Sequence, residues 1–483
     1  MAHPTHSPHP SRTGHDPGAS GPHAPRRWAA LALISVAQFM LILDVTVVNV
    51  ALPDIGRDLV LGRTALTWAV TAYTLFFGGL MLLGGRLADA FGGRRMMLAG
   101  LVVFTVASLV TGLAQNEASL LGGRVAQGVG AALLSPAALS TITTTFHGAE
   151  RTKALSVWAS LGGIGFAAGV LAGGVLTAGP GWRWAFFVNV PVGMAVLAAL
   201  PATVPAQGSG GARRLDVLGA LTVTAATAAF IYGMIHAGDA GWSAAGTLVP
   251  LAAAVVLYAV FALVERTVRH PLMHVGMLAR RPVAAGAFLM LVASGLLISM
   301  FFLGSQYLQH ARHIGALETG LLFLPAALGT GLGAHLGGRL VGTIGTRPVA
   351  VGGLGLIAVG TGLLTGLSGH GSVATGLLPG IVVATVGVGP VFVAATSSAL
   401  AHVTHEEAGL ASGVINTFHE LGAAVGVAVA STIAATGLSA VPAIGGFTDA
   451  YAVFAVAAAV AAVLALWLVP PGRPRSTGMP HAH

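Results

Sequence analysis

Long apolar runs separated by short polar connections recur along the chain from residue 28 to residue 470. Most runs have about 20 residues or more, enough for a helix to cross a bilayer whose hydrocarbon core is roughly 30 Å thick. Backbone groups in lipid must find hydrogen-bond partners within the chain, so runs of this kind form helices. The pattern predicts fourteen transmembrane helices: 28–50, 66–87, 95–114, 120–144, 154–178, 184–203, 215–237, 246–266, 282–308, 315–341, 348–368, 374–402, 409–437 and 450–470.

Composition supports an all-α integral membrane protein. Only 8% of the residues are charged, 55% are hydrophobic, and the mean hydropathy is +0.84. A soluble protein carries about 25% charged residues, so the composition excludes a soluble enzyme and a nucleic-acid-binding domain. The chain has no cysteine, which excludes disulfides and thiolate metal sites. The composition of residues 1–27 predicts a disordered tail. His3, His6 and His9 in this tail lack the fixed scaffold that a metal site needs. We therefore expect no metal and no cofactor.

The basic residues indicate the orientation, because cytoplasmic loops carry an excess of Lys and Arg. With a cytoplasmic N-terminus, eighteen of the 23 Lys and Arg residues fall on the cytoplasmic side and one, Arg124, lies within a span. The remaining four lie outside: Arg57, Arg63, Arg183 and Arg312. This asymmetry explains the formal net charge of +8 without a nucleic-acid partner. We therefore expect both termini in the cytoplasm.

A short sequence occurs twice on the predicted cytoplasmic side. Residues 84–94 read GGRLADAFGGR and residues 337–347 read GGRLVGTIGTR, so both fit GGRLxxxxGxR. The copies lie eight predicted helices apart in the same orientation, which indicates two similar halves with two helices inserted between them. Coincidence is the weaker alternative, because the topology matches. The predicted parts are a disordered cytoplasmic tail (1–27), a six-helix bundle (28–203), two inserted helices with a cytoplasmic linker (204–281), a second six-helix bundle (282–470) and a cytoplasmic tail (471–483).

Five segments carry a family resemblance: LDVTVVNVALPDI at 43–55, GGRLADAFGGRR at 84–95, GGRVAQGVGAALLSP at 122–136, GFAAGVLAGG at 165–174 and WRWAFFVNVPVG at 182–193. With these motifs the chain resembles the major facilitator superfamily, in particular its branch of 14-helix drug:proton antiporters. The resemblance extends over all fourteen predicted helices. It departs from the usual motifs at Ala90 and Gly93, where arginine is typical, and at Val170, where proline is typical.

The resemblance implies a major facilitator fold, with two six-helix bundles and two inserted linker helices. It also implies a cytoplasmic gate motif, in which the aspartate latches one conformation; a plain cluster of helix-end charges is the alternative. The gate residues are Gly85, Asp89, Gly92 and Arg94. Helix 5 would carry an antiporter motif, formed by Gly165, Gly169, Gly173 and Gly174. Apart from the resemblance, a glycine every fourth residue lets a neighbouring helix approach closely, and static packing is the alternative role of that surface.

Three clearly charged side chains fall inside predicted spans: Asp44, Arg124 and Glu420. A charge in the hydrocarbon costs at least about 2.5 kcal/mol, so these residues are functional candidates. At a rise of about 1.5 Å per residue, Asp44 lies about 9 Å and Arg124 about 6 Å from the outer ends of their helices, and we expect them to pair. A protonatable carboxylate beside an arginine can couple proton uptake to a conformational change. A static ion pair between helices 1 and 4 is the alternative, disfavoured because buried pairs stabilise poorly.

Glu420 lies near the middle of predicted helix 13, and no arginine is predicted at its depth in helices 9–14. A lone carboxylate there can bind a cationic substrate, a proton, or both. The alternative is a protonated Glu420 that is hydrogen-bonded to His419 or Asn416. Together with Asp44 and Arg124, Glu420 completes the set of residues that we expect to couple transport to protons.

The sequence also indicates how transport is driven. An ATP-driven pump needs a phosphate-binding loop, GxxxxGK[ST], but the only lysine, Lys153, follows Thr152. No cluster of catalytic polar residues predicts an enzyme, and no repeated filter sequence predicts a channel. We expect a monomeric secondary transporter whose partners are the lipid bilayer, protons and a small-molecule substrate. The resemblance implies a plasma-membrane multidrug exporter of lipophilic or amphipathic molecules, and a dedicated exporter or importer of one metabolite is the alternative.

Overall fold

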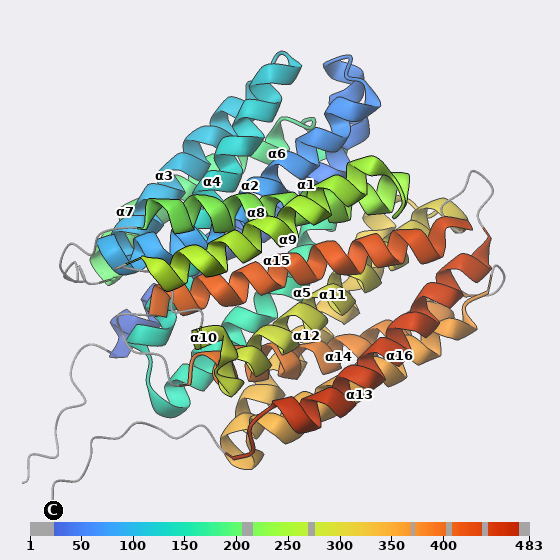
Figure 1. Cartoon of the computed structure of the whole chain (residues 1–483). Coiled ribbons are helices and arrows are strands. Elements are labelled where there is room, and N and C mark those ends of the chain that lie inside the picture. The colour runs from blue at the N-terminus through green and yellow to red at the C-terminus, as the bar shows by residue number, and fades with distance from the viewer. Residues whose placement is uncertain are drawn as a thin grey trace, which may run out of the picture.

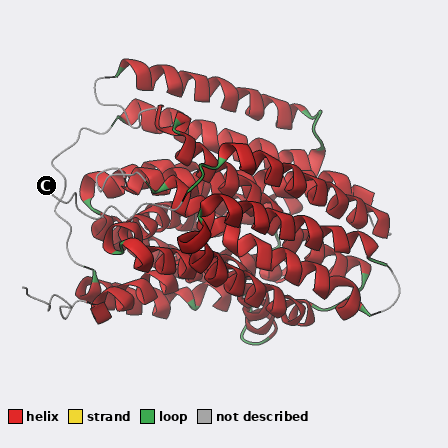
Figure 2. Ribbon diagram, turned by 90° about the horizontal axis from the view of Figure 1, so that it is seen from below, coloured by secondary structure: helices red, strands yellow, loops and turns green. Residues whose placement is uncertain are grey.

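The computed structural model describes residues 24–204, 216–268, 276–368, 372–401, 408–436 and 443–472. Within these ranges the chain forms helices joined by short turns, without a strand (Figure 2). Thirteen helices in the described part are long and apolar enough to cross a membrane. Most of the predicted tails, with His3, His6 and His9, lie outside the described residues. Residues 24–27, predicted in the tail, belong instead to the first helix, which begins at Ala24.

The helices match the predicted spans in order. Those before residue 205 are α1 Ala24–Asp58, α2 Arg63–Phe91, α3 Gly93–Gly112, α4 Glu117–Thr145, α5 Gly148–Ala178, α6 Trp184–Phe187 and α7 Asn189–Thr203. The inserted segment contains α8 Val217–Ala240, α9 Ala245–Thr267 and the short α10 Gly276–Ala279. The rest are α11 Arg281–Gln306, α12 Ala316–Ile344, α13 Thr346–Leu363, α14 Val373–Ala399, α15 Ala408–Ile433 and α16 Ile444–Leu468. Predicted helix 5 lies within α5, and predicted helix 6 is divided between α6 and α7.

The sequence repeat is also a structural repeat. In both copies the glycine between two helices has a positive φ, 91° at Gly92 and 90° at Gly345, a conformation that favours glycine. The arginine two residues later reaches the end of another helix. Arg94 Nη1 donates to the carbonyl oxygen of the C-cap residue just after α7, at 3.1 Å, and Arg347 Nε donates to the carbonyl oxygen of the C-cap residue just after α16, at 2.7 Å. The accepting residues are Val204 and Val469.

A second arginine caps each of the same two helices. Arg26, near the start of α1, donates to Ala202 O of α7 at 2.7 Å. Arg281, at the start of α11, donates to Leu468 O of α16 at 3.3 Å and to Trp467 O. The last carbonyls of a helix lack intrahelical partners and carry partial negative charge, so a guanidinium stabilises them. Basic residues that predict the topology therefore also fasten the last helix of each repeat.

We call this end of the bundle the basic end; it is marked by residues at the starts of α1, α3, α5, α11 and α13, namely Arg26, Arg94, Arg151, Arg281 and Arg347. Close glycine contacts repeat as well. A Cβ built on Gly100 of α3 would lie 2.6 Å from Gly130 O of α4, and one on Gly353 of α13 would lie 2.7 Å from Gly387 O of α14. Both helix pairs need glycine for this approach, so α3 and α4 correspond to α13 and α14.

The inserted helix α8 lies beside α2 and α15, and α9 packs against α8 (Figure 1). α8 contacts both α2 and α15: a Cβ on Gly79 of α2 would lie 3.4 Å from Ala228 Cβ of α8, and Trp242, just after α8, donates to Thr432 Oγ1 of α15 at 2.9 Å. Only 17% of the apolar membrane-spanning stretch of α9 is buried in the protein, whereas 78% of that of α4 is buried. α9 is therefore a peripheral helix whose apolar surface suits lipid, and α4 is a central one.

Candidate functional site

Asp44 and Arg124 lie together in the interior. Asp44 stands past the middle of α1 and Arg124 in the first half of α4. Arg124 Nη1 lies 2.5 Å from Asp44 Oδ2, and the two side chains are 1% and 0% exposed. The structure thus brings these two predicted residues into one buried ion pair between α1 and α4.

Three polar side chains that the sequence analysis missed complete the surroundings of Asp44. Gln127 Nε2 donates to Asp44 Oδ1 at 3.0 Å, and Asn189 Nδ2 donates to the same oxygen at 2.8 Å. Ser108 Oγ accepts from Gln127 at 2.9 Å and from Asn189 at 3.4 Å. All three side chains are buried. The two carboxylate oxygens accept hydrogen bonds from three side chains, which is an environment built for an ionised carboxylate.

Arg124 has further partners besides Asp44. Its Nε donates to Ala69 O of α2 at 2.8 Å, and its Nη1 also donates to Gln127 Oε1 at 2.9 Å. The guanidinium carbon lies 4.5 Å from the centroid of the Tyr73 ring, within the range of a cation–π interaction. Breaking a buried pair by removing one charge typically costs about 3–5 kcal/mol, because the other charge is left uncompensated. Loss of either charge would create that situation, so the two charges depend on each other.

Glu420 lies at the middle of α15 and outside the ion pair. Its side chain is 12% exposed, and its Oε1 lies 3.3 Å from His419 Nδ1, the ion-pair partner found for it in the described part of the chain. Of the two predicted partners, His419 is therefore the one that contacts Glu420, whereas Asn416 Nδ2 has no hydrogen-bond partner among the described residues. A Cβ built on Gly78 of α2 would lie 3.2 Å from Glu420 Cβ. The acid of the second repeat thus packs against a helix of the first.

The glycines of α5 pack against α1. Cβ atoms built on Gly165, Gly169 and Gly173 would lie between 1.6 and 3.0 Å from atoms of α1. The α1 residues that they face are one turn apart: Ile42, Thr46 and Val50. Gly174 faces α12 instead, where the nearest atoms belong to Leu317 at 3.6 Å. The first three glycines therefore seat the segment of α1 that carries the buried carboxylate, and the fourth lies at a contact between the repeats.

The gate motif lies at the basic end and touches the start of α15. Asp89 Oδ2 accepts a hydrogen bond from the Leu410 backbone N–H at 2.7 Å. Leu410 is the third residue of α15, and the first N–H groups of a helix lack intrahelical partners. Asp89 therefore caps α15 from another helix, in the manner of an N-cap side chain. Gly92 and Arg94 form the turn after α2 and its contact with α7.

Arg151 binds the C-terminal end of α14, next to the contact of Asp89 with the start of α15. Arg151 Nη2 donates to Leu400 O, at the C-cap of α14, at 2.7 Å. Burial lowers the pKa of Arg151 from its usual value, but an arginine keeps its charge. The negative Asp89 at a helix N-terminus and the positive Arg151 at a helix C-terminus both suit the helix dipoles. A Cβ built on Gly413 would lie 3.4 Å from Gly85 Cα, so α2 and α15 also meet closely here.

A second charged cluster lies at the opposite end of the bundle. Asp58, the last residue of α1, accepts hydrogen bonds from Arg183 Nη1 at 2.5 Å and from Trp182 Nε1 at 3.1 Å. Arg183 also donates to Ala114 O at 3.1 Å. The hydrogen bond from Arg183, with a smaller contribution from Trp182, lowers the pKa of Asp58 from its usual value. The cluster ties the ends of α1, α3 and α6 together.

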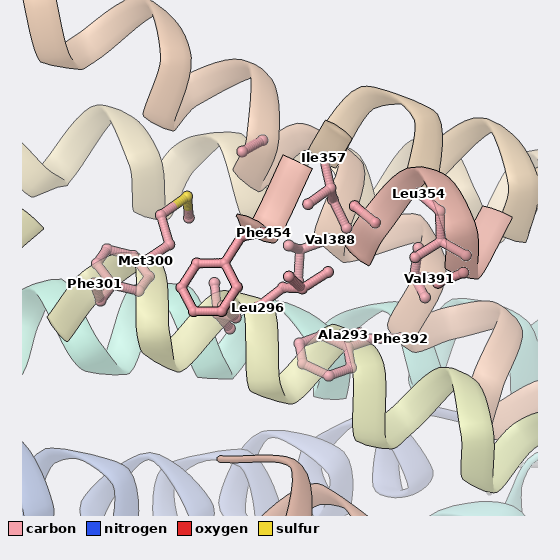
Figure 3. Packing of buried hydrophobic residues seen from close by; sticks show 14 of the residues in the cluster. Ala293, Leu296, Met300, Phe301, Leu354, Ile357, Val388, Val391, Phe392 and Phe454 are labelled. Carbon is pink, nitrogen blue, oxygen red and sulfur yellow. The ribbon is translucent and has the colours of Figure 1, made fainter. Parts of the chain in front are cut away.

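The second repeat has uncharged residues where the first has its buried ion pair, and apolar residues in place of the arginine and the two amides. Equivalent positions lie at equal distances along the helices from the paired glycines of α4 and α14 and from Val204 and Val469. The counterparts of Arg124, Gln127 and Asn189 are Ile381, Ala384 and Phe454. All three belong to the apolar core formed chiefly by α11–α16, and Figure 3 shows Phe454 close to Leu296 and Val388. The buried ion pair and the two amides are therefore specific to the first repeat.

Comparison with known proteins extends these observations. The family model described as Major Facilitator Superfamily matches residues 34–305 and 283–482. The chain is 40% identical over 414 residues to the puromycin resistance protein of Streptomyces alboniger, covering 85% of this chain and 82% of that protein. It is 38% identical over 453 residues to the lincomycin resistance protein of Streptomyces lincolnensis, with 91% of each covered. A crystal structure of a human organic anion transporter has the same fold, with a TM-score of 0.64 at 15% identity over 93% of this chain and 100% of that one.

Proposed function

The chain belongs to the Major Facilitator Superfamily, and we propose that it exports lipophilic or amphipathic small molecules, antibiotics among them, in exchange for protons by alternating access. Membership makes it a multi-pass membrane transporter of small molecules and not an enzyme. Its relatives for puromycin and lincomycin resistance support antibiotics as substrates. The observation that carries the proton coupling is the buried ion pair of Asp44 with Arg124.

Protonation of Asp44 removes the counter-ion of Arg124. With Asp44 ionised, its hydrogen bonds tie α1 to α4 and α7. A hydrogen bond that involves a charged group contributes about 1.5–3 kcal/mol, and protonation weakens the three that converge on this carboxylate. The change amounts to several kcal/mol, which is the scale that separates two conformations of a transporter. Proton uptake therefore shifts the equilibrium between them.

The second repeat argues against a purely static role for the pair. Ile381 occupies the position equivalent to Arg124 and packs in an apolar core. The same helix arrangement is thus formed without an ion pair, in keeping with the general weakness of buried pairs as stabilisers. This comparison supports a functional role for the charges of the first repeat. Glu420, partly exposed and without an arginine partner among the described residues, supports a site for a cationic substrate, a proton, or both.

We assign the structure to a state that is closed at the basic end. The contacts of Asp89 with α15 and of Arg151 with α14 join the two repeats there. By the positive-inside rule we infer that this end faces the cytoplasm, with both termini on that side of the plasma membrane. In the proposed cycle the bundles of residues 28–203 and 282–470 rock against each other, and these contacts break when the cytoplasmic side opens.

The proposal is tested with the purified full chain in proteoliposomes that enclose a pH indicator. Puromycin and lincomycin serve as probes, and the direction of proton movement is recorded when each drug is added on one side. We expect protons to move opposite to the drug, and an imposed pH gradient to drive the drug uphill. Drug movement that ignores the gradient would exclude proton coupling. Proton movement in the same direction as the drug would identify an importer by symport.

A further inference from the structure

Tyr73 of α2 lies on the face of the buried arginine that Asp44 does not occupy. Its side chain is buried, and its ring centroid lies 4.5 Å from the Arg124 guanidinium carbon. Among the described residues, its hydroxyl oxygen is buried without a hydrogen-bond partner. A buried hydroxyl without a partner costs free energy, so a conformation in which it gains an acceptor is favoured by that amount. The Tyr73 ring therefore contacts the Arg124 cation, while its hydroxyl group lacks a hydrogen-bond acceptor among the described residues.

Glu420 of α15 is the carboxylate that packs against α2 near Tyr73. A Cβ built on Gly78 would lie 3.2 Å from Glu420 Cβ, and Gly78 follows Tyr73 by about one and a half helical turns. Asp44 is thus in direct contact with Arg124, and Glu420 packs against the helix that carries the Tyr73 ring.

We propose that Tyr73 is the positioning residue that couples a proton on Asp44 to the binding of an organic cation at Glu420. This inference rests on the proposed proton-coupled export and deepens it. When Asp44 is ionised, it neutralises Arg124, and Glu420 is left to bind a monovalent lipophilic cation. When a proton from water binds Asp44 Oδ2, Arg124 loses its counter-ion, and its charge is balanced by Glu420. The Tyr73 ring then holds the guanidinium while its O–H donates to the Glu420 carboxylate, and the organic cation leaves.

Charge balance supports this exchange. With the cation bound, the charges of Asp44, Arg124, Glu420 and the cation sum to zero. With the proton bound instead, Asp44 is neutral, and Arg124 and Glu420 again sum to zero. A cluster in a low-dielectric interior is least costly when it carries no net charge, so both loaded states are favoured over the empty, negatively charged one. The exchange is one proton for one monovalent cation.

The test measures how pH changes the affinity of the purified full chain for tetraphenylphosphonium. We expect the wild-type affinity to fall by about 10- to 100-fold from about pH 8 to about pH 5, a coupling of ordinary size. Tyr73→Phe keeps the ring and removes the donor, and we expect it to bind as tightly as wild type at high pH but to lose most of the pH dependence. Tyr73→Leu removes the ring as well and should abolish the dependence.

Phe186→Leu is the matched control, because the Phe186 ring lies 6.0 Å from the same guanidinium carbon but belongs to α6. It should keep the wild-type pH profile. His419 is the other titratable group in contact with Glu420, so the series is repeated in a His419→Gln background to separate imidazole titration. A Tyr73→Phe profile identical with wild type would overturn the coupling role, whether or not Tyr73→Leu folds.

Failure of this inference differs from failure of the proposed function. A wild-type protein that exchanges puromycin for protons, but does not bind tetraphenylphosphonium or binds it equally at all pH values, overturns the coupling through Tyr73 and leaves proton-driven export intact. A wild-type protein whose drug transport ignores the pH gradient overturns the proposed function and this inference with it.

Discussion

Gly169→Ala should separate α1 from α5 next to the Asp44–Arg124 ion pair. The added Cβ would lie 1.6 Å from Thr46 Oγ1, 2.7 Å from Thr46 Cβ and 3.3 Å from Leu43 O. A rotation about χ1 of Thr46 can move its hydroxyl but not its Cβ. Carbon atoms pack best at about 3.5–4.0 Å, so the helices must move apart by roughly 1 Å. Overpacking of this kind costs about 1–3 kcal/mol.

Gly174→Ala is the internal control for this substitution. It lies on the same helix and in the same motif, but its nearest neighbour would be 3.6 Å from the new Cβ, an ordinary contact. Both substitutions gain about 1 kcal/mol of helix propensity, so the difference between them measures packing alone. We expect Gly169→Ala to be less stable than Gly174→Ala by about 1–3 kcal/mol and to transport more slowly.

The assays are thermal unfolding of the purified protein and drug transport in proteoliposomes. A second substitution, Thr46→Gly in the Gly169→Ala chain, removes the two closest atoms and moves the glycine from one helix to the other. We expect it to restore part of the lost stability. If Gly169→Ala is as stable and as active as Gly174→Ala, the close contact between α1 and α5 determines neither the stability nor the transport rate.

Three further predictions concern the helix ends. Arg347→Gln should weaken the end of α16 by about 1–3 kcal/mol, seen as faster hydrogen exchange there, whereas the exposed Arg339→Gln should not; equal exchange in both would refute the capping role. Because the pKa of Asp58 is lower in the folded than in the unfolded chain, the ionised Asp58 stabilises the fold at pH values above its unfolded pKa, and this contribution is lost as pH falls below about 4. Asp58→Asn should flatten that part of the plot of stability against pH. An unchanged acid transition would contradict this prediction. Arg151→Gln and Asp89→Asn should each lengthen the distance between spin labels on the α2–α3 and α12–α13 turns. The chain has no native cysteine, so labels can be attached to cysteines introduced at these turns. An unchanged distance would rule out a latch.

Much of the fold and the two charged partners follow from the sequence, for a physical reason. A membrane span must be long, apolar and helical, so its pattern is distinctive even in a single sequence. A charge within such a span is costly and therefore rare, which leaves few candidates. Asp44 and Arg124 are found in this way, and their contact follows from similar depth in two helices of the same bundle.

The uncharged partners of Asp44 were not predicted, because the cost of burying a charge does not single out uncharged side chains. Amides and hydroxyls are cheaper to bury than charges and occur in many spans, so Gln127, Asn189 and Ser108 do not stand out by composition. Gln127 follows Arg124 by three residues, and helical spacing could have placed it on the same face. Asn189 comes from a distant helix and needs the tertiary structure. The arginine caps were missed because a count of charges gives the side of the membrane but not the carbonyls that the charges bind.

The most direct test compares Asp44→Asn with wild type in two transport modes. Asn cannot take up a proton but is close to Asp in size, and Asp54→Asn, on the same helix outside the ion pair, is the control. We expect Asp44→Asn to lose drug accumulation driven by a pH gradient while it still exchanges labelled for unlabelled drug, and Asp54→Asn to keep both. Gradient-driven accumulation at the wild-type level in Asp44→Asn would contradict proton coupling through the buried pair.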